Sequence, residues 1–345
     1  MECATCKKPA TLACSGCKGA TVLEGDAPSV HYCNAGCQKA NWTQHKATCR
    51  RLQDRIVLYS VVEMAQRLFY VNRELTWIYL DIEKVEKTSD RMETTWPADY
   101  RVFPSQLVSS KEDKNSILVF LACIEGYMWT VEFVEGMLKG IVTTSTHVVY
   151  KTKNDKLRTR CYSMTTPIEE IVRDTGGITH EMLKVTLRSG EVFAVDITGA
   201  QYGYNEPVTP WTKYQNDRIL FQYPESGQPA PRPYRLLQVN DYSLQKLIYF
   251  CKKMAGDKTA EEAIPFVFAG TLKAMNLRIL GWQGNEKLSL RDMWKLPEKT
   301  LRVKLNDLID FVEWSFHGIV QYPWSTVNGK RLATENKHSW VYGKK

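Results

Sequence analysis

The sequence predicts an α+β protein in which a small metal-stabilised module precedes a larger body. Three observations lead to this fold class: seven of the ten cysteines lie within the first 50 residues, a helical periodicity begins directly after them, and β-branched segments follow further along the chain. The 345 residues are 43% hydrophobic and 24% charged, which excludes wholesale disorder and allows a sizeable core.

No segment of the sequence is expected to enter a membrane or direct secretion. The longest apolar run is Ile117–Ile124, whereas a bilayer-spanning helix needs roughly 20 residues. The first residues, MECATC, form neither a charged nor an apolar leader region. We therefore expect an intracellular protein of the cytoplasm or nucleus.

The net charge gives only weak support for nucleic-acid binding. Seven zinc-bound thiolates and two zinc ions would reduce the formal net charge of +8 to about +5. Short basic runs remain, but such runs are usually solvated faces. We expect a protein partner and no nucleic acid.

Eight possible zinc ligands are spaced in pairs. They are Cys3, Cys6, Cys14, Cys17, Cys33, Cys37, His45 and Cys49. In each of the first two pairs, two residues separate the ligands and permit a tight turn that directs both sulfurs to one ion. In each of the last two pairs, three residues separate the ligands, and a helical turn would place both donors on one face. Four such donors close a tetrahedral site, so eight complete two structural zinc sites and leave no position for a catalytic water.

Residues 32–49, YCNAGCQKANWTQHKATC, strongly resemble the MYND zinc finger. This resemblance covers residues 1–50 and implies that the ligand pairs interleave. Cys3, Cys6, Cys33 and Cys37 would hold one zinc, and Cys14, Cys17, His45 and Cys49 the other. Because this segment has few apolar residues, metal binding should supply most of its folding free energy.

The same resemblance implies that the finger binds short proline-rich peptides of regulatory partners, with contacts at Gln38 and Trp42. A flat aromatic ring beside an amide suits a polyproline II ligand. The alternative is that Trp42 packs against the body of its own chain, as large aromatic side chains usually do.

The body, residues 51–345, is expected to combine helices with a β-hairpin. Apolar periodicity predicts helices over about 51–77, 116–140, 242–255, 260–276 and 301–319. Extended patterns predict strands over about 141–151, 181–188 and 191–198. The last two strands would form a hairpin around Ser189-Gly190. Residues 84–116, 203–235 and the tail after Gln321 are expected to be mostly irregular.

A thiol-dependent acyl transferase or hydrolase is the alternative function of the body. His180 directly precedes the predicted hairpin and Asp196 lies on its second strand, and a carboxylate and an imidazole on adjacent antiparallel strands can meet across the sheet. The arrangement is similar to the His-and-Asp hairpin of transglutaminase-like proteins, and DITGAQYG at 196–203 resembles a segment of uncharacterised fungal MYND proteins. The hypothesis requires a cysteine sulfur within hydrogen-bond distance of His180. Neither Cys123, in an apolar helix, nor Cys161 is a convincing nucleophile, so no catalytic residue is assigned.

A methyltransferase activity is disfavoured as well. MYND fingers also occur in SET-domain lysine methyltransferases, which resemble one another in an Asn-His-Ser-Cys segment and a C-terminal cysteine cluster. This chain has no Asn-His pair, and Cys251 is its last cysteine. We therefore expect a zinc-binding interaction or scaffold protein rather than an enzyme.

Overall fold

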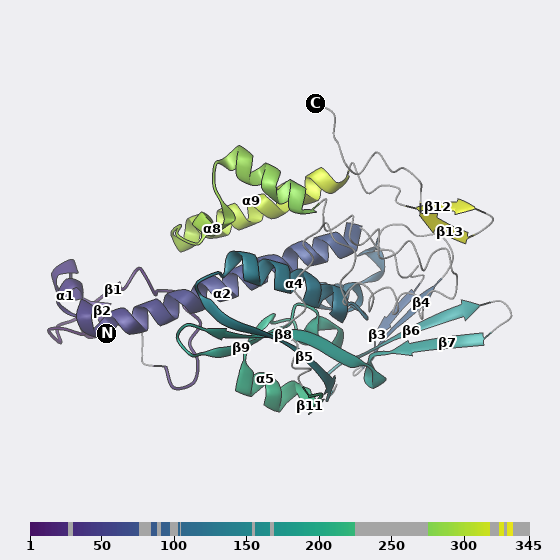
Figure 1. Cartoon of the computed structure of the whole chain (residues 1–345), viewed down its shortest axis with the longest axis horizontal. Coiled ribbons are helices and arrows are strands. Elements are labelled where there is room, and N and C mark those ends of the chain that lie inside the picture. The colour runs from purple at the N-terminus through teal and green to yellow at the C-terminus, as the bar shows by residue number, and fades with distance from the viewer. Residues whose placement is uncertain are drawn as a thin grey trace.

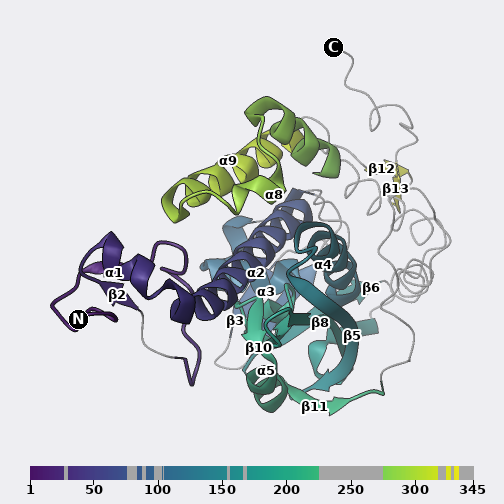
Figure 2. The ribbon, with the colours of Figure 1, turned by 60° about the vertical axis from the view of Figure 1, so that its left-hand side comes forward.

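One long helix joins the N-terminal finger to the body in the computed structural model (Figure 1). This helix, α2, runs from Trp42 to Leu75. The finger stands at one end of the molecule, and the far part of α2 lies between the other helices and a sheet (Figure 2). The structure describes residues 1–26, 30–75, 84–87, 91–96, 103, 105–153, 156–165, 169–224, 275–317, 324–327 and 330–333.

The finger contains little regular structure besides α2. Strand β1 (Leu12–Ala13) pairs antiparallel with β2 (His31–Tyr32). A short helix, α1 (Ala35–Ala40), follows, and the side chain of its N-cap residue Asn34 accepts a hydrogen bond of 2.9 Å from the Cys37 N–H. Such a cap satisfies a backbone donor that the first helical turn leaves unpaired.

Helix α2 begins nine residues earlier than the predicted start at residue 51. The periodicity argument followed apolar residues only, and the first eight residues of α2 instead carry the ligands His45 and Cys49. The middle of the helix is the centre of the hydrophobic core, with Leu58, Val61, Val62, Ala65, Leu68 and Phe69 all fully buried.

A five-stranded antiparallel sheet forms the other side of the core. Its strands are β5 (Val142–Thr152), β8 (Thr179–Leu187), β9 (Val192–Val195), β10 (Val208–Pro210) and β11 (Ile219–Gln222), in the order β10-β9-β8-β5-β11. β8 and β9 form the expected hairpin, and Gly190 in its turn has a φ of 87°, a conformation that favours glycine.

The two faces of this sheet cover different helices. Leu183 and Val185 on β8 belong to the main core with α2 and α4 (Cys123–Met137). Met182 on the same strand packs with Tyr214 of α5 (Trp211–Arg218) in a separate apolar cluster. This alternation is the side-chain period of a strand. It places the sheet between two helical layers.

The helix predicted over 116–140 is two helices. α3 (Lys111–Leu118) ends before a short turn, and α4 begins at Cys123. Leu121 in that turn has a φ of 55°, which no α-helix tolerates, and its N–H donates to Oε1 of Gln201 at 3.1 Å. A tertiary contact therefore accompanies a break in a strongly apolar sequence.

The region expected to be irregular after residue 84 contains part of a second sheet. Strands β3 (Lys84–Lys87), β4 (Arg91–Trp96), β6 (Arg158–Thr165) and β7 (Glu169–Asp174) form it in the order β3-β4-β6-β7. β4 and β6 pair in parallel across more than 60 residues of chain. Their sequences are polar and lack the apolar alternation that predicts a half-buried strand. Single-turn 3-10 helices span Ser105–Leu107, Thr175–Gly177 and Gly199–Tyr202.

The C-terminal part adds helices above α2 (Figure 1). They comprise a helical stretch over 275–286, α8 (Leu290–Met293) and α9 (Glu298–His317), where a helix over 301–319 was predicted. The predicted helix 242–255 lies outside the described residues, as does 260–276 except for its last two residues. The segment 203–235, expected to be a loop, includes β10, α5 and β11. Strands β12 (Trp324–Val327) and β13 (Lys330–Ala333) pair within the expected irregular tail.

Among the helices described, none has the length and apolar character needed to cross a bilayer.

Ion pairs fix the finger to the body. Arg55 of α2 is 1% exposed and contacts Asp26 of the finger and Glu191, the residue directly before β9. Arg51 also contacts Asp26, at 3.1 Å. Hydrogen bonding to Arg55 lowers the pKa of Asp26, so this carboxylate stays ionised. The finger loop, α2 and the hairpin thus share one buried cation.

We predict that Arg55→Ala lowers the free energy of unfolding by about 3–5 kcal/mol, because it leaves Glu191 without this cation and Asp26 with Arg51 alone. Urea denaturation of the zinc-loaded chain measures the change. Lys213→Ala, which removes an exposed ion pair of 2.6 Å to Asp217, is the control and should cost less than about 1 kcal/mol. Equal effects of the two variants would contradict the prediction.

Candidate metal centre and a buried histidine cluster

The first ligand group lies at the start of the finger. The sulfurs of Cys3, Cys6, Cys33 and Cys37 all lie within 4.8 Å of one another. Cys6 and Cys33 are 3.6 Å apart, and Cys33 and Cys37 are 3.5 Å apart. A tetrahedron of zinc–sulfur bonds requires sulfur separations of roughly 3.8 Å. The group therefore has the dimensions of a zinc site.

The second group joins the early finger to α2. It consists of Cys14, Cys17, His45 and Cys49, again within 4.8 Å of one another and all buried or nearly so. The Cys14 and Cys49 sulfurs are 3.8 Å apart, and Nε2 of His45 lies 3.5 Å from the Cys17 sulfur. The interleaved ligand pairing expected from the family resemblance is confirmed.

Only one of the two later ligand pairs lies on a single helical turn. His45 and Cys49 are i, i+4 neighbours within α2. Cys33, in contrast, precedes the N-cap of α1, and Cys37 lies inside that helix. The expectation of a helical turn for Cys33 and Cys37 was therefore wrong. A capped helix start brings these two sulfurs together equally well.

Ionisation of several of these thiols is unfavourable without a cation. Hydrogen bonding with Cys33 and burial raise the pKa of Cys37 to about 12. Burial and the neighbouring Cys14 raise the pKa of Cys49 to about 11. Several thiolates this close repel one another unless a metal balances their charge. Burial lowers the pKa of His45, which keeps the imidazole in its neutral, metal-binding form.

The donor set fits two structural zinc ions. Thiolate and neutral imidazole are zinc ligands, and each group supplies four donors, so a tetrahedral ion has no position left for water or substrate. Further hydrogen bonds orient the ligands, as when Nε2 of Gln38 donates to the Cys14 sulfur at 3.5 Å.

The structure places Gln38 and Trp42, the two predicted peptide contacts, on consecutive helices. Gln38 lies on α1, and Trp42 is the first residue of α2. The Trp42 side chain is 40% exposed, and its ring meets the His45 ring edge-on, with 6.3 Å between centroids. Trp42 therefore packs on a zinc ligand and keeps much of its surface in solvent.

In the body, His180 and Asp196 lie together as the hairpin suggested. Nε2 of His180 is 3.0 Å from Oδ1 of Asp196, an electrostatic contact between two buried groups. Burial alone would raise the pKa of Asp196, but His180 and Arg218 lower it to about 2. The carboxylate also caps a turn, since the Thr198 N–H donates to Oδ1 at 3.1 Å. Asp196 therefore contacts His180 and caps a turn at once.

Three tyrosines that the sequence did not single out enclose this pair. Tyr214 donates to Oδ2 of Asp196 at 2.7 Å, and its hydroxyl is 2.5 Å from that of Tyr150. The rings of Tyr150 and Tyr202 meet the His180 ring edge-on. Tyr202 lies six residues after Asp196, but the other two come from β5 and α5, and no local pattern links them to His180.

Cys123 lies beside this cluster without a hydrogen bond to His180. Its sulfur is 3.9 Å from the carbonyl oxygen of Thr179, the residue before His180. Within the part of the chain that the structure describes, neither ring nitrogen of His180 has a hydrogen-bond partner. The side chains of Cys161 and Cys251 lie outside the described residues. The contact that the thiol-enzyme hypothesis requires is therefore not formed here.

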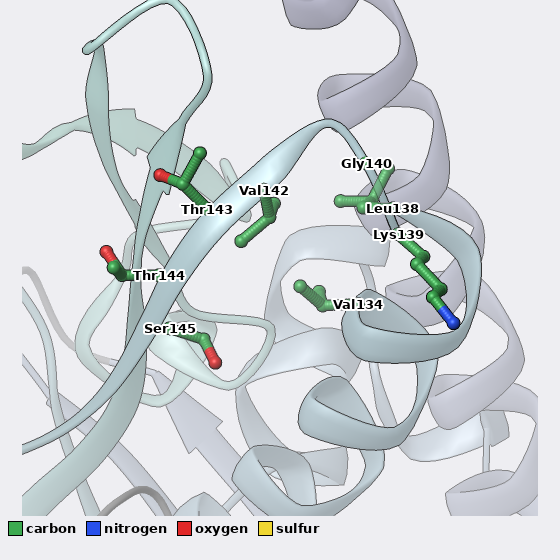
Figure 3. Close-up of a pocket in the computed structure, with 8 residues that line it drawn as sticks. All are labelled: Val134, Leu138, Lys139, Gly140, Val142, Thr143, Thr144 and Ser145. Carbon is green, nitrogen blue, oxygen red and sulfur yellow. The ribbon is translucent and has the colours of Figure 1, made fainter.

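A shallow pocket elsewhere on the body contains no comparable group. It lies between the end of α4, at Val134 and Leu138, and the start of β5, at Val142 and Ser145 (Figure 3). Lys139 is its sole charged lining residue, and two of its threonines are exposed. Nothing in this lining indicates a reaction or a cofactor.

Comparison with known proteins identifies residues 3–49 as a MYND finger. A curated relative, "SET domain and MYND-type zinc finger protein 6" of Schizosaccharomyces pombe, is 30% identical over 99 residues. The alignment covers 27% of this chain and 18% of the relative. The chain thus corresponds to less than a fifth of that protein. No solved structure matches the chain.

We predict that His45→Ala leaves one tightly bound zinc per chain where the unaltered protein holds two. The substitution removes one of four donors from the second group, and the first group keeps all of its own. Zinc is counted by atomic emission after dialysis against a competing chelator. His31→Ala, which changes a histidine of the finger outside both groups, should retain two ions. Two ions in both variants would contradict the ligand assignment.

Proposed function

We propose that the MYND finger at residues 3–49 binds a short, proline-rich segment of a protein partner, and that the body holds the finger as a scaffold. The observation that carries this proposal is the exposure of Trp42. An indole that is 40% exposed on a metal-held module offers a flat apolar surface to a ligand. This function needs no reaction at the zinc ions.

The position of Trp42 supports binding rather than internal packing. Its described ring contact is with His45 of the finger, so the alternative that Trp42 packs on the body gains no support. Because zinc fixes His45 and α2 fixes Trp42, the indole is held in one orientation before a ligand arrives. Preorganisation of this kind lowers the entropic cost of binding.

Gln38 has a different part in this proposal. Its amide N–H is directed to the Cys14 sulfur, which orients the side chain beside the metal group. The amide oxygen is the atom that would accept a hydrogen bond from a peptide. A polyproline II segment is extended in advance and presents flat pyrrolidine rings, which suit stacking on the indole.

The scaffold role rests on the attachment of the finger. α2 continues from the zinc ligands into the core, and the Arg55 ion pairs add a second link. A partner bound at Trp42 would therefore be held at a fixed place relative to the body. A role in regulatory complexes of the cytoplasm or nucleus is consistent with such a module.

We predict that Trp42→Ala weakens the binding of proline-rich peptides at least about tenfold, because aromatic anchors dominate the energy of small interfaces. The probe is an array of twelve-residue proline-rich peptides, and fluorescence polarisation of the strongest binder measures its Kd. Trp314→Ala is the matched control, since this tryptophan of α9 is 75% exposed and distant in sequence from the finger. Unchanged affinity in a Trp42→Ala variant that retains two zinc ions would refute the proposal.

A further inference from the structure

The part of the finger that carries Trp42 also carries exposed positive charge. Lys39 lies in the last turn of α1, and Lys46 and Arg50 lie on α2, four and eight residues after Trp42. All three basic residues are exposed. Residues four apart on a helix are neighbours on its surface, so Lys46 and Arg50 continue from the indole along α2. These four residues are called the Trp42 strip below.

The cations of the strip have no ion-pair partner in the described part of the chain. Asp54 lies one helical turn after Arg50, but both of its carboxylate oxygens accept hydrogen bonds from Arg188. Asp26 of the finger contacts Arg55 instead of the strip. The positive charge beside Trp42 is therefore open to a ligand.

The backbone of the strip is held in place by the second metal group. His45 and Cys49 supply donors to that group from the same turns of α2. Lys46 and Arg50 each follow a ligand by one residue and lie outside the group. A ligand at the strip would therefore restrict only side chains, which keeps the entropic cost of binding low.

The charge of the whole finger limits what these cations can bind. Residues 1–50 contain five lysines and one arginine against three carboxylates, which gives +3. Two zinc ions add 4 and seven bound thiolates subtract 7, so the loaded finger has no net charge. Binding to a nucleic-acid backbone draws on a broad excess of positive charge. A local strip on a neutral module instead fits a short peptide with a few carboxylates.

The length of the strip matches a few residues of extended peptide. Each helical residue adds about 1.5 Å, so Lys46 lies about 6 Å and Arg50 about 12 Å beyond Trp42 along the helix axis. A polyproline II segment rises about 3.1 Å per residue. A peptide that lies along α2 would therefore reach these two cations about two and four residues away from its contact with the indole.

We propose that the Trp42 strip selects proline-rich segments that carry aspartate or glutamate beside the prolines. A proline contacts the indole of Trp42, and the carboxylates on one flank lie beside Lys46 and Arg50. Lys39 meets a carboxylate on the other flank. This inference rests on the proposed function, because it names the class of peptide that the finger binds. Charges at the rim of an interface act mainly on partner choice and on the rate of association.

The experiment compares three fluorescent peptides that share one proline-rich core. They carry glutamate, glutamine or lysine at the second and fourth positions on either side of the core. Fluorescence polarisation with the zinc-loaded full chain measures each Kd at low ionic strength. Because each exposed ion pair contributes little, the glutamate peptide should bind at least about fivefold more tightly than the glutamine peptide, and the lysine peptide should bind most weakly. High salt should remove the difference, since it screens exposed charges. Equal Kd values at low salt would overturn the proposal.

A paired substitution tests which cations give the preference. Lys46→Gln together with Arg50→Gln should remove the preference for glutamate and leave the Kd of the glutamine peptide unchanged. Lys213→Gln together with Lys295→Gln is the matched control, because it removes the same charge from exposed positions on the body. This control should keep the preference. A preference that survives the first pair, or is lost in the second, would contradict the assignment to the strip.

Trp42→Ala separates failure of this inference from failure of the proposed function. If the substitution weakens binding while the unaltered chain does not distinguish glutamate from glutamine, only the charge preference is wrong. If no proline-rich peptide depends on Trp42, the proposed function fails and the inference fails with it.

A DNA duplex of twenty base pairs is the final competitor. It should not displace the glutamate peptide at physiological ionic strength. Displacement there would mean that the strip binds polyanions in general, and would overturn the proposal of an acidic peptide.

Discussion

The fold depends on one helix that belongs to two structures at once. The first turns of α2 supply His45 and Cys49 to the second ligand group, and its middle turns supply the centre of the hydrophobic core. The finger has almost no core of its own, so metal ligation holds it together. Loss of the metal would release the start of the helix on which the core is built.

The finger could be predicted because its information is local. Pairs of ligands separated by two or three residues indicate a metal site without reference to distant parts of the chain. The prediction that Trp42 contacts a peptide rests on the same segment. The β8–β9 hairpin and the contact of His180 with Asp196 were predictable for the same reason, since a short turn brings two neighbouring strands together and limits which of their residues come close.

Features that rest on distant contacts were not predictable. The polar strands β4 and β6 pair although a long stretch of chain separates them. The break between α3 and α4 depends on a hydrogen bond from Leu121 to Gln201. Arg55 lies on the surface of an isolated helix and becomes buried only because Asp26 and Glu191 approach it from two sides. In each case the deciding partner lies far away in sequence.

Because α2 is continuous, the number of its residues between the finger and the body determines the rotation of the finger about the helix axis. Each residue of an α-helix adds about 1.5 Å of length and about 100° of rotation. One residue inserted between Cys49 and Arg55 would turn the indole of Trp42 to another side of the molecule and separate Asp26 from Arg55. An insertion of seven residues would rotate the finger by nearly two whole turns. Only changes of about that size would return a bound peptide to its original bearing.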